Sequence, residues 1–243
     1  MSDRGDEIIH IIQPITGRRI YRFCLSLGII GLVAAIMVIF AYWATYPLFI
    51  EGVLAADHDI ITQSNELFNT IHSWDFQISC LVATGYYGYL SKTGSKFSIV
   101  FVLMSFDDIV YLLLSFVSSF PPFLSDPKLL HFIYEYGSIL AKIGLAAILL
   151  KTRNTTSSTL LLTLASIMIF FSPLFNLLWP IITLPYQASV TIVLFSYYEY
   201  TVHYFLNAQF YYPLILIPIL TFILTLLLFI NELRNDESIL PIS

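Results

Sequence analysis

Six long apolar runs constrain this chain more than any other feature of its sequence. They lie at positions 23–46, 74–90, 97–120, 129–150, 160–184 and 213–230. Each has about 17–25 mainly apolar residues, the length of a helix that crosses the hydrocarbon core of a bilayer. With 58% hydrophobic and only 11% charged residues, the chain lacks the polar groups that cover a soluble domain. The sequence predicts an all-α, polytopic transmembrane helical bundle, a single integral membrane domain over 1–243.

Three segments fall outside these runs. Residues 1–22 are a polar head, expected to lie on the inner leaflet as a short amphipathic helix that Pro14 interrupts. Residues 47–70 are polar and predict an external loop. Residues 186–212 are rich in tyrosine and are either an external interfacial segment or a seventh span. Tyrosine favours membrane interfaces, and a charged Glu199 inside the bilayer is costly, so six spans are the preferred prediction.

The distribution of basic residues predicts the orientation of the chain. If the spans alternate, one side receives eight of the lysines and arginines: Arg4, Arg18, Arg19, Arg22, Lys92, Lys96, Lys151 and Arg153. The loops on the other side contain only Lys128. Because cytoplasmic loops are enriched in Lys and Arg, the N-terminus is predicted to be cytoplasmic and the protein to be a multi-pass protein of the cell membrane.

Charge and cysteine usage exclude some classes of partner and cofactor. A net charge of −5 argues against binding to nucleic acid, whose phosphates attract basic surfaces. The two cysteines, Cys24 and Cys80, lie in apolar runs and offer neither a disulfide framework nor a zinc spacing. The expected partners are the lipid bilayer and other membrane subunits, because so small a chain has little soluble mass of its own.

Ionisable residues inside the predicted spans are the first candidate site. Four polar residues at intervals of four, three and four share one helix face: His131, Glu135, Ser138 and Lys142. Asp107 and Asp108 lie roughly 15 Å deep in the neighbouring span. We expect Lys142 to pair with one aspartate. Glu135 and the other aspartate then remain as a proton path or cation site, because unpaired charge inside a membrane is costly and typically functional.

Histidines near the predicted outer boundary are the second candidate site. His58, His72 and His131 lie there, and His203 joins them if the chain has six spans. Two histidines on different helices can ligate the iron of haem b. Two or three histidines with Asp75 or Glu135 can bind copper, iron or zinc. No established metal-binding spacing occurs in the chain, so the pattern does not fix the cofactor.

These sites leave several functional hypotheses open, and the sequence does not decide whether the protein is an enzyme. The first is a membrane subunit of a multi-subunit respiratory or redox complex that carries electrons and transfers protons. The second is a proton- or cation-coupled transporter or channel. The third is a non-catalytic assembly subunit. Residues Ser172–Asn176, ahead of an outer segment and a last span, also loosely resemble the layout of the A subunit of archaeal ammonia monooxygenases. That resemblance implies a subunit of a membrane-bound metal monooxygenase and assigns no residue roles.

Overall fold

The computed structural model describes residues 3–55, 57–92, 98–117, 127–152, 158–194, 198–205 and 208–237. These residues form α1 (Asp3–Ala55), α2 (His58–His72), α3 (Asp75–Lys92), α4 (Ile99–Met104), α5 (Phe106–Val117), α6 (Pro127–Lys151), α7 (Thr159–Ile182), the 3₁₀ turn η2 (Leu184–Tyr186), β1 (Gln187–Leu194), β2 (Tyr198–Phe205), the 3₁₀ turn η3 (Ala208–Phe210) and α8 (Tyr212–Glu237). Three helical segments are long and apolar enough to cross a membrane: Arg19–Gly52, Thr159–Ile182 and Tyr212–Asn235. A predominantly helical fold that contains helices long and apolar enough to span a membrane is thereby confirmed.

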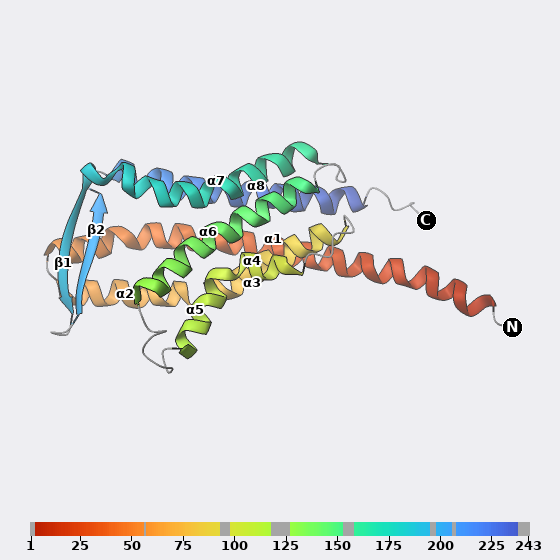
Figure 1. Ribbon diagram of the computed structural model, residues 1–243, viewed down its shortest axis with the longest axis horizontal. Coiled ribbons are helices and arrows are strands. Elements are labelled where there is room, and N and C mark those ends of the chain that lie inside the picture. The colour runs from red at the N-terminus through yellow and green to blue at the C-terminus, as the bar shows by residue number, and fades with distance from the viewer. Residues whose placement is uncertain are drawn as a thin grey trace.

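The helices run alongside one another along the long axis of the molecule (Figure 1). α1 begins and α8 ends at the same end of the bundle. α2 and α3 run back along α1 toward the end where α1 begins. α4 and α5 then run toward the opposite end, and α6 returns (Figure 1). α7 and α8 form the last antiparallel pair, and the β1–β2 hairpin between them lies across the far end (Figure 1).

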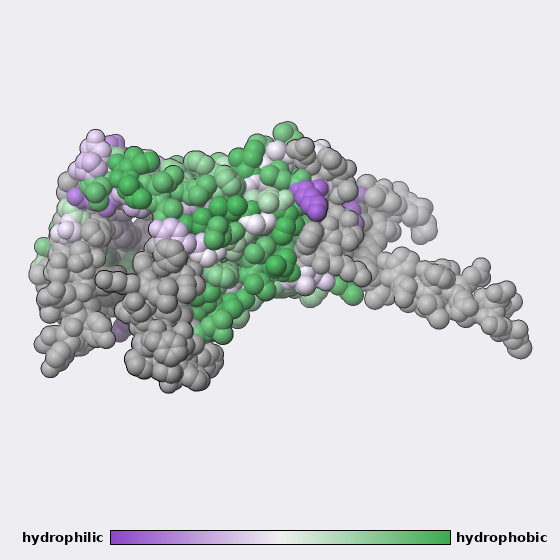
Figure 2. Space-filling view, viewed as in Figure 1, coloured by the Kyte–Doolittle hydropathy of each residue, from purple (hydrophilic) through white to green (hydrophobic). Residues whose placement is uncertain are grey.

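Charged and aromatic residues mark the two ends of this bundle. The basic end contains Arg22, Lys92, Lys151 and Arg234. The aromatic end contains two of the three tryptophans of the chain and the first residue of α8: Trp43, Trp179 and Tyr212. The helical rise between the two ends, from Arg22 to Trp43, is roughly 32 Å. Figure 2 shows that the face between the ends is mainly apolar.

Close backbone packing joins α1, α3 and α8. A Cβ atom on Gly28 would lie 2.4 Å from the Cα of Gly85, so the backbones of α1 and α3 touch at this point. Phe229 of α8 packs against Gly85 and is fully buried. Small residues permit such close approach of helices in membrane proteins. The three helices thus form one rigid core.

Residues 47–55 and 58–70 are helical, so the prediction of a loop there is wrong, whereas its external position stays a prediction. α1 continues to Ala55, Asp57 caps the next helix by accepting hydrogen bonds from the amides of Asp59 and Ile60, and α2 packs back on α1. Polar residues suggested a loop, but they alternate with apolar ones at helical spacing. Ile61 and Phe68 lie two helical turns apart on α2, and both pack with Phe49 of α1.

Residues 187–194 and 198–205 form two antiparallel strands, so the described residues of this segment contain no seventh helical span, and an interfacial position for it stays a prediction. Gln187 pairs with Phe205 and Leu194 with Tyr198. Both strands are rich in β-branched and aromatic residues, which favour strands over helices. The abundant tyrosines indicated a membrane interface, whereas alternation of residue types with a period of two is the pattern that indicates a strand.

Two further differences concern the continuity of helices. The predicted span 97–120 is broken at Ser105 into α4 and α5. The polar head was expected to be a separate short helix interrupted at Pro14, whereas α1 runs without a break from Asp3 to Ala55. One proline removes a single backbone hydrogen bond, which a helix of this length tolerates.

Candidate functional site

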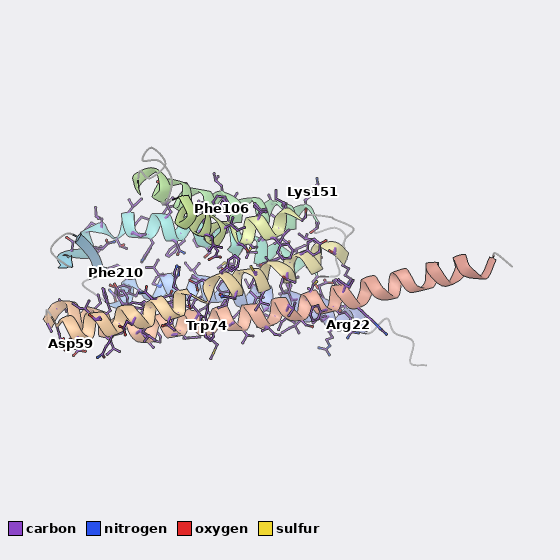
Figure 3. All side chains as sticks on the ribbon, turned by 90° about the horizontal axis from the view of Figure 1, so that it is seen from below. Arg22, Asp59, Trp74, Phe106, Lys151 and Phe210 are labelled. Atoms are coloured by element: carbon purple, nitrogen blue, oxygen red, sulfur yellow. The ribbon has the colours of Figure 1, made fainter. Side chains whose placement is uncertain are left out.

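Six polar side chains form a polar track that leads from the aromatic end into the middle of the bundle. They come from the end of α2, the first turns of α3, the start of α5 and the middle of α6: His72, Asp75, Ser79, Asp108, Asp107 and Lys142. Figure 3 labels Trp74, which precedes Asp75, and Phe106, which precedes Asp107, at similar positions along the bundle but on opposite sides of it.

The outermost pair is His72 with Asp75. α2 ends at His72, a two-residue turn follows, and α3 begins at Asp75. This turn brings His72 Nδ1 within 2.7 Å of Asp75 Oδ2. The His72 side chain is 49% exposed, so the pair is open to the surface beside Trp74.

The second step joins α3 to α5. Ser79 lies one turn further along α3 than Asp75, and its side chain lies near the Asp108 carboxylate of α5. Asp108 also lies within electrostatic range of Asp107, Asp75 and His72. The charged groups of the track therefore share one electrostatic field, although they belong to different helices.

The innermost step joins α5 to α6. The break at Ser105 places Asp107 and Asp108 in the first turn of α5, where the helix dipole stabilises negative charge. Lys142 Nζ lies 3.2 Å from Asp107 Oδ2, so the ion pair predicted between Lys142 and one aspartate is present. Within the described part of the chain, Asp107 Oδ1 and Ser105 Oγ are buried and have no hydrogen-bond partner. The polar groups around the break are thus incompletely satisfied.

The remaining predicted site residues are placed by their backbones only. His58 is the first residue of α2, His131 and Glu135 lie on α6, and His203 lies on β2 opposite Ser189. Their side chains lie outside the described residues. Among the side chains that are described, no three His, Cys, Asp or Glu residues gather as metal ligands. Haem b, copper or iron at this end of the protein stays a prediction.

A second charged cluster, at the basic end, was missed by sequence reasoning. Lys92 Nζ lies 2.8 Å from Glu232 Oε2, and the Lys92 ammonium also sits 5.5 Å from the centre of the Tyr21 ring. Glu232 is only 1% exposed. We call these three residues the basic-end clamp, because they join α1, α3 and α8. Glu232 lies two residues after the last apolar run, and this position at the end of a predicted span was the one feature of the sequence that could have indicated a buried charge.

Further hydrogen bonds reinforce the basic half. The Tyr86 hydroxyl of α3 lies 2.9 Å from Thr225 Oγ1 of α8, and both side chains are buried. Thr225 donates to the carbonyl of Thr221, so Tyr86 is the donor in the first of these bonds. The Asn231 amide also donates to the Ser158 hydroxyl at the start of α7. These bonds tie α3 and α7 to α8.

Comparison with known proteins assigns no family to this chain. No family model, no curated protein and no solved structure matches it. The resemblance of Ser172–Asn176 to ammonia monooxygenase subunits therefore stays a prediction. The functional argument depends on the geometry of the site itself.

Proposed function

We propose that this protein moves protons, or small cations, across a membrane, and that the polar track is the outer half of their path. The proposal adopts six spans with both ends of the chain in the cytoplasm. Its main support is the sequence of contacts from His72 at the aromatic end to the Lys142–Asp107 pair in the middle of the bundle. Carboxylates at membrane depth are costly and typically mark ion or proton pathways.

The two ends of the bundle support this placement in a membrane. Their separation of roughly 30 Å matches the hydrocarbon thickness of a bilayer. Among the lysines and arginines with described side chains, all except Lys142 lie at the basic end, as expected of a cytoplasmic side. Tryptophans collect at membrane interfaces, and Trp43 and Trp179 lie toward the opposite end. The polar track then opens to the outside.

Exposure of the inner pair supports a wet pathway. Lys142 is 36% exposed and Asp107 is 26% exposed, although Lys142 lies nine residues, about 14 Å, from the basic end of α6. Charge facing lipid at this depth is strongly disfavoured, so this opening is expected to hold water or the transported ion. The unpartnered Asp107 Oδ1 provides an acceptor for that water or ion.

The track stops halfway, which favours a coupled transporter over an open channel. Between Lys142 and the basic end, α6 presents Leu145 and Leu149 to the core, and both are fully buried. α1, α3 and α8 are closed there by the basic-end clamp. Passage therefore requires a rearrangement that gives Asp107 access to the cytoplasm. The break between α4 and α5 at Ser105 is the natural hinge, because discontinuous helices carry the ion sites of many transporters.

The proposal is tested by proton flux in proteoliposomes that contain only this protein. An imposed pH gradient with potassium and valinomycin drives flux, and a pH-sensitive dye inside the vesicles reports it. Asp107→Asn is expected to lower the rate by about a hundredfold, the lower end of what a positioned proton-transfer group contributes. Glu66→Gln, which removes an exposed acid of α2 outside the track, is expected to leave the rate unchanged.

The outcomes separate the competing functions. Absence of flux in the folded wild-type protein for protons, Na⁺ and K⁺ would overturn the proposal and favour an assembly subunit whose charges a partner covers. Flux that survives both Asp107→Asn and Asp108→Asn would place the pathway elsewhere. The redox-subunit hypothesis requires the same proton path together with a cofactor. An absorption spectrum and metal analysis of the purified protein test that cofactor separately.

A further inference from the structure

An open groove lies between α1 and α8 at the aromatic end, away from the polar track. Its volume is about 1060 Å³, the size of a site for a drug-sized or larger molecule. One wall is the stretch of α1 from Ile39 to Ala55, and the other is the start of α8 from Tyr211 to Ile215. Tyr46 and Tyr211 join the walls through their hydroxyls, 3.0 Å apart.

The groove is apolar at one end and polar at the other, which matches the structure of an amphiphilic molecule. Ile39 lies four residues from Trp43 on the membrane side, about 6 Å deeper, and faces Leu214 and Ile215 of the other wall. Glu51 lies eight residues from Trp43 on the outer side, about 12 Å further out. One end of the groove is therefore apolar and continuous with the bilayer, whereas the other end carries a carboxylate in water.

Apolar surface extends further out than the bilayer covers. Leu54 lines the outer part of the groove and is 64% exposed. It lies about 16 Å beyond Trp43, whereas the headgroup region adds only about 5–8 Å to each side of the hydrocarbon core. An exposed apolar wall at this height is costly unless something covers it. A lipid drawn partly out of the outer leaflet would cover this outer wall with the part of the molecule near its headgroup. Its acyl chain would fill the deeper part of the groove.

The charges at this end select the headgroup. Glu51 is the acidic residue of the groove, whereas Asp57, Asp59 and Glu66 belong to α2 or its N-cap and lie outside the groove lining. The exposed rings of Trp43 and Tyr212 offer aromatic faces, which attract ammonium groups. An anionic headgroup meets repulsion here. We propose that the groove binds an outer-leaflet phospholipid with an ammonium headgroup, ethanolamine or choline, and that Glu51 holds the ammonium.

Native mass spectrometry of the detergent-purified protein tests the proposal. The probes are phosphatidylethanolamine and phosphatidylglycerol with identical acyl chains, supplied in equal amounts. We expect the wild-type protein to retain the ethanolamine lipid about threefold more than the glycerol lipid. Glu51→Gln is expected to abolish this preference, whereas Glu66→Gln, an exposed acid outside the groove, is expected to preserve it. Trp43→Ala is expected to lower retention of the ethanolamine lipid.

Several results would overturn the inference. Equal retention of the two lipids by the wild-type protein would do so even if every variant failed to fold. So would equal effects of Glu51→Gln and Glu66→Gln, because the preference would then reflect the general charge of this end. A dimer in the same spectra that excludes lipid would assign the groove to a second copy of the chain. Proton flux does not depend on the groove in our scheme, so either proposal can fail alone.

Discussion

Two lysine–carboxylate pairs occupy opposite halves of this bundle, and their surroundings differ sharply. In the basic-end clamp, Glu232 is 1% exposed, while Lys92 keeps 34% of its side chain exposed and sits 5.5 Å from the centre of the Tyr21 ring. In the polar track, both Lys142 and Asp107 keep a quarter or more of their surface exposed, and Asp107 Oδ1 is buried without a hydrogen bond. The same ionic chemistry therefore serves two purposes. A closed pair joins helices, whereas an open pair remains available to exchange partners.

The backbone around each pair accounts for the difference. The clamp lies beside the close contact of Gly28 with Gly85, where three helices pack without space for a Cβ atom. The track lies beside the break at Ser105, where the regular helix is interrupted. Dense packing fixes a pair in one arrangement, and an interrupted helix permits more than one. Substitutions in the two halves of the bundle test this contrast, from the largest expected loss of stability to the smallest.

Lys92→Ala should give the largest loss. The substitution removes the cation from the buried Glu232 carboxylate, and an uncompensated buried charge is strongly destabilising. We expect the free energy of unfolding in detergent to fall by about 3 kcal/mol, the low end of the range for a buried pair, because Lys92 is one-third exposed. Denaturant or thermal unfolding at neutral pH measures it.

Lys151→Ala is the matched control, because Lys151 is an exposed cation at the same end. Its effect should stay within about 0.5 kcal/mol. The double variant Lys92→Met with Glu232→Leu should recover much of the stability, since apolar groups of similar volume often replace a buried pair without loss. Equal effects of Lys92→Ala and Lys151→Ala would contradict a clamp.

Gly28→Ala should cost about 2 kcal/mol, within the range for overpacking. The new Cβ would lie 2.4 Å from the backbone of Gly85, so the two helices must separate. Gly144→Ala on α6 is the control, because its Cβ would meet only Leu103 at an ordinary 3.8 Å. That control should be neutral or slightly stabilising, since alanine is the better helix former. Similar losses for both variants would show that the contact is not specific.

Tyr86→Phe should cost about 1 kcal/mol, because it removes one buried hydrogen bond and leaves the ring in place. Tyr46→Phe is the counterpart at the aromatic end, where the hydroxyl pair with Tyr211 is only partly buried. Water can replace that bond, so its loss should be smaller. A larger loss for Tyr46→Phe would reverse the predicted contrast between the two halves.

The polar track was easier to predict from the sequence than the basic-end clamp, because its charged residues lie deep inside apolar runs. Asp107 and Lys142 stand inside apolar runs, where a charge is conspicuous, and helix spacing was enough to pair them. Glu232 stands just past the end of an apolar run, where a charge usually faces water. Only the tertiary packing of α8 against α3 buries it.

The errors in the fold have a similar cause. Segments between apolar runs were assigned by their polarity, although periodicity decides secondary structure. In α2, Ile61 and Phe68 recur at helical spacing, and in β2, Tyr198 and Tyr200 alternate with other residues at a strand's period of two. The break at Ser105 leaves no mark in composition, because α4 and α5 are both apolar.

The smallest expected effect is the most informative for function. A double-mutant cycle with Asp107→Asn and Lys142→Met measures the coupling within the track, and a partly exposed pair should contribute less than about 1 kcal/mol. The same cycle at Lys92 and Glu232 should give a clearly larger coupling, because Glu232 has no access to solvent. Weak coupling lets Asp107 release the lysine without unfolding the bundle, which proton or cation passage requires. If the two cycles give equal couplings, the track is a second structural clamp and the loss of flux in Asp107→Asn must be attributed to folding.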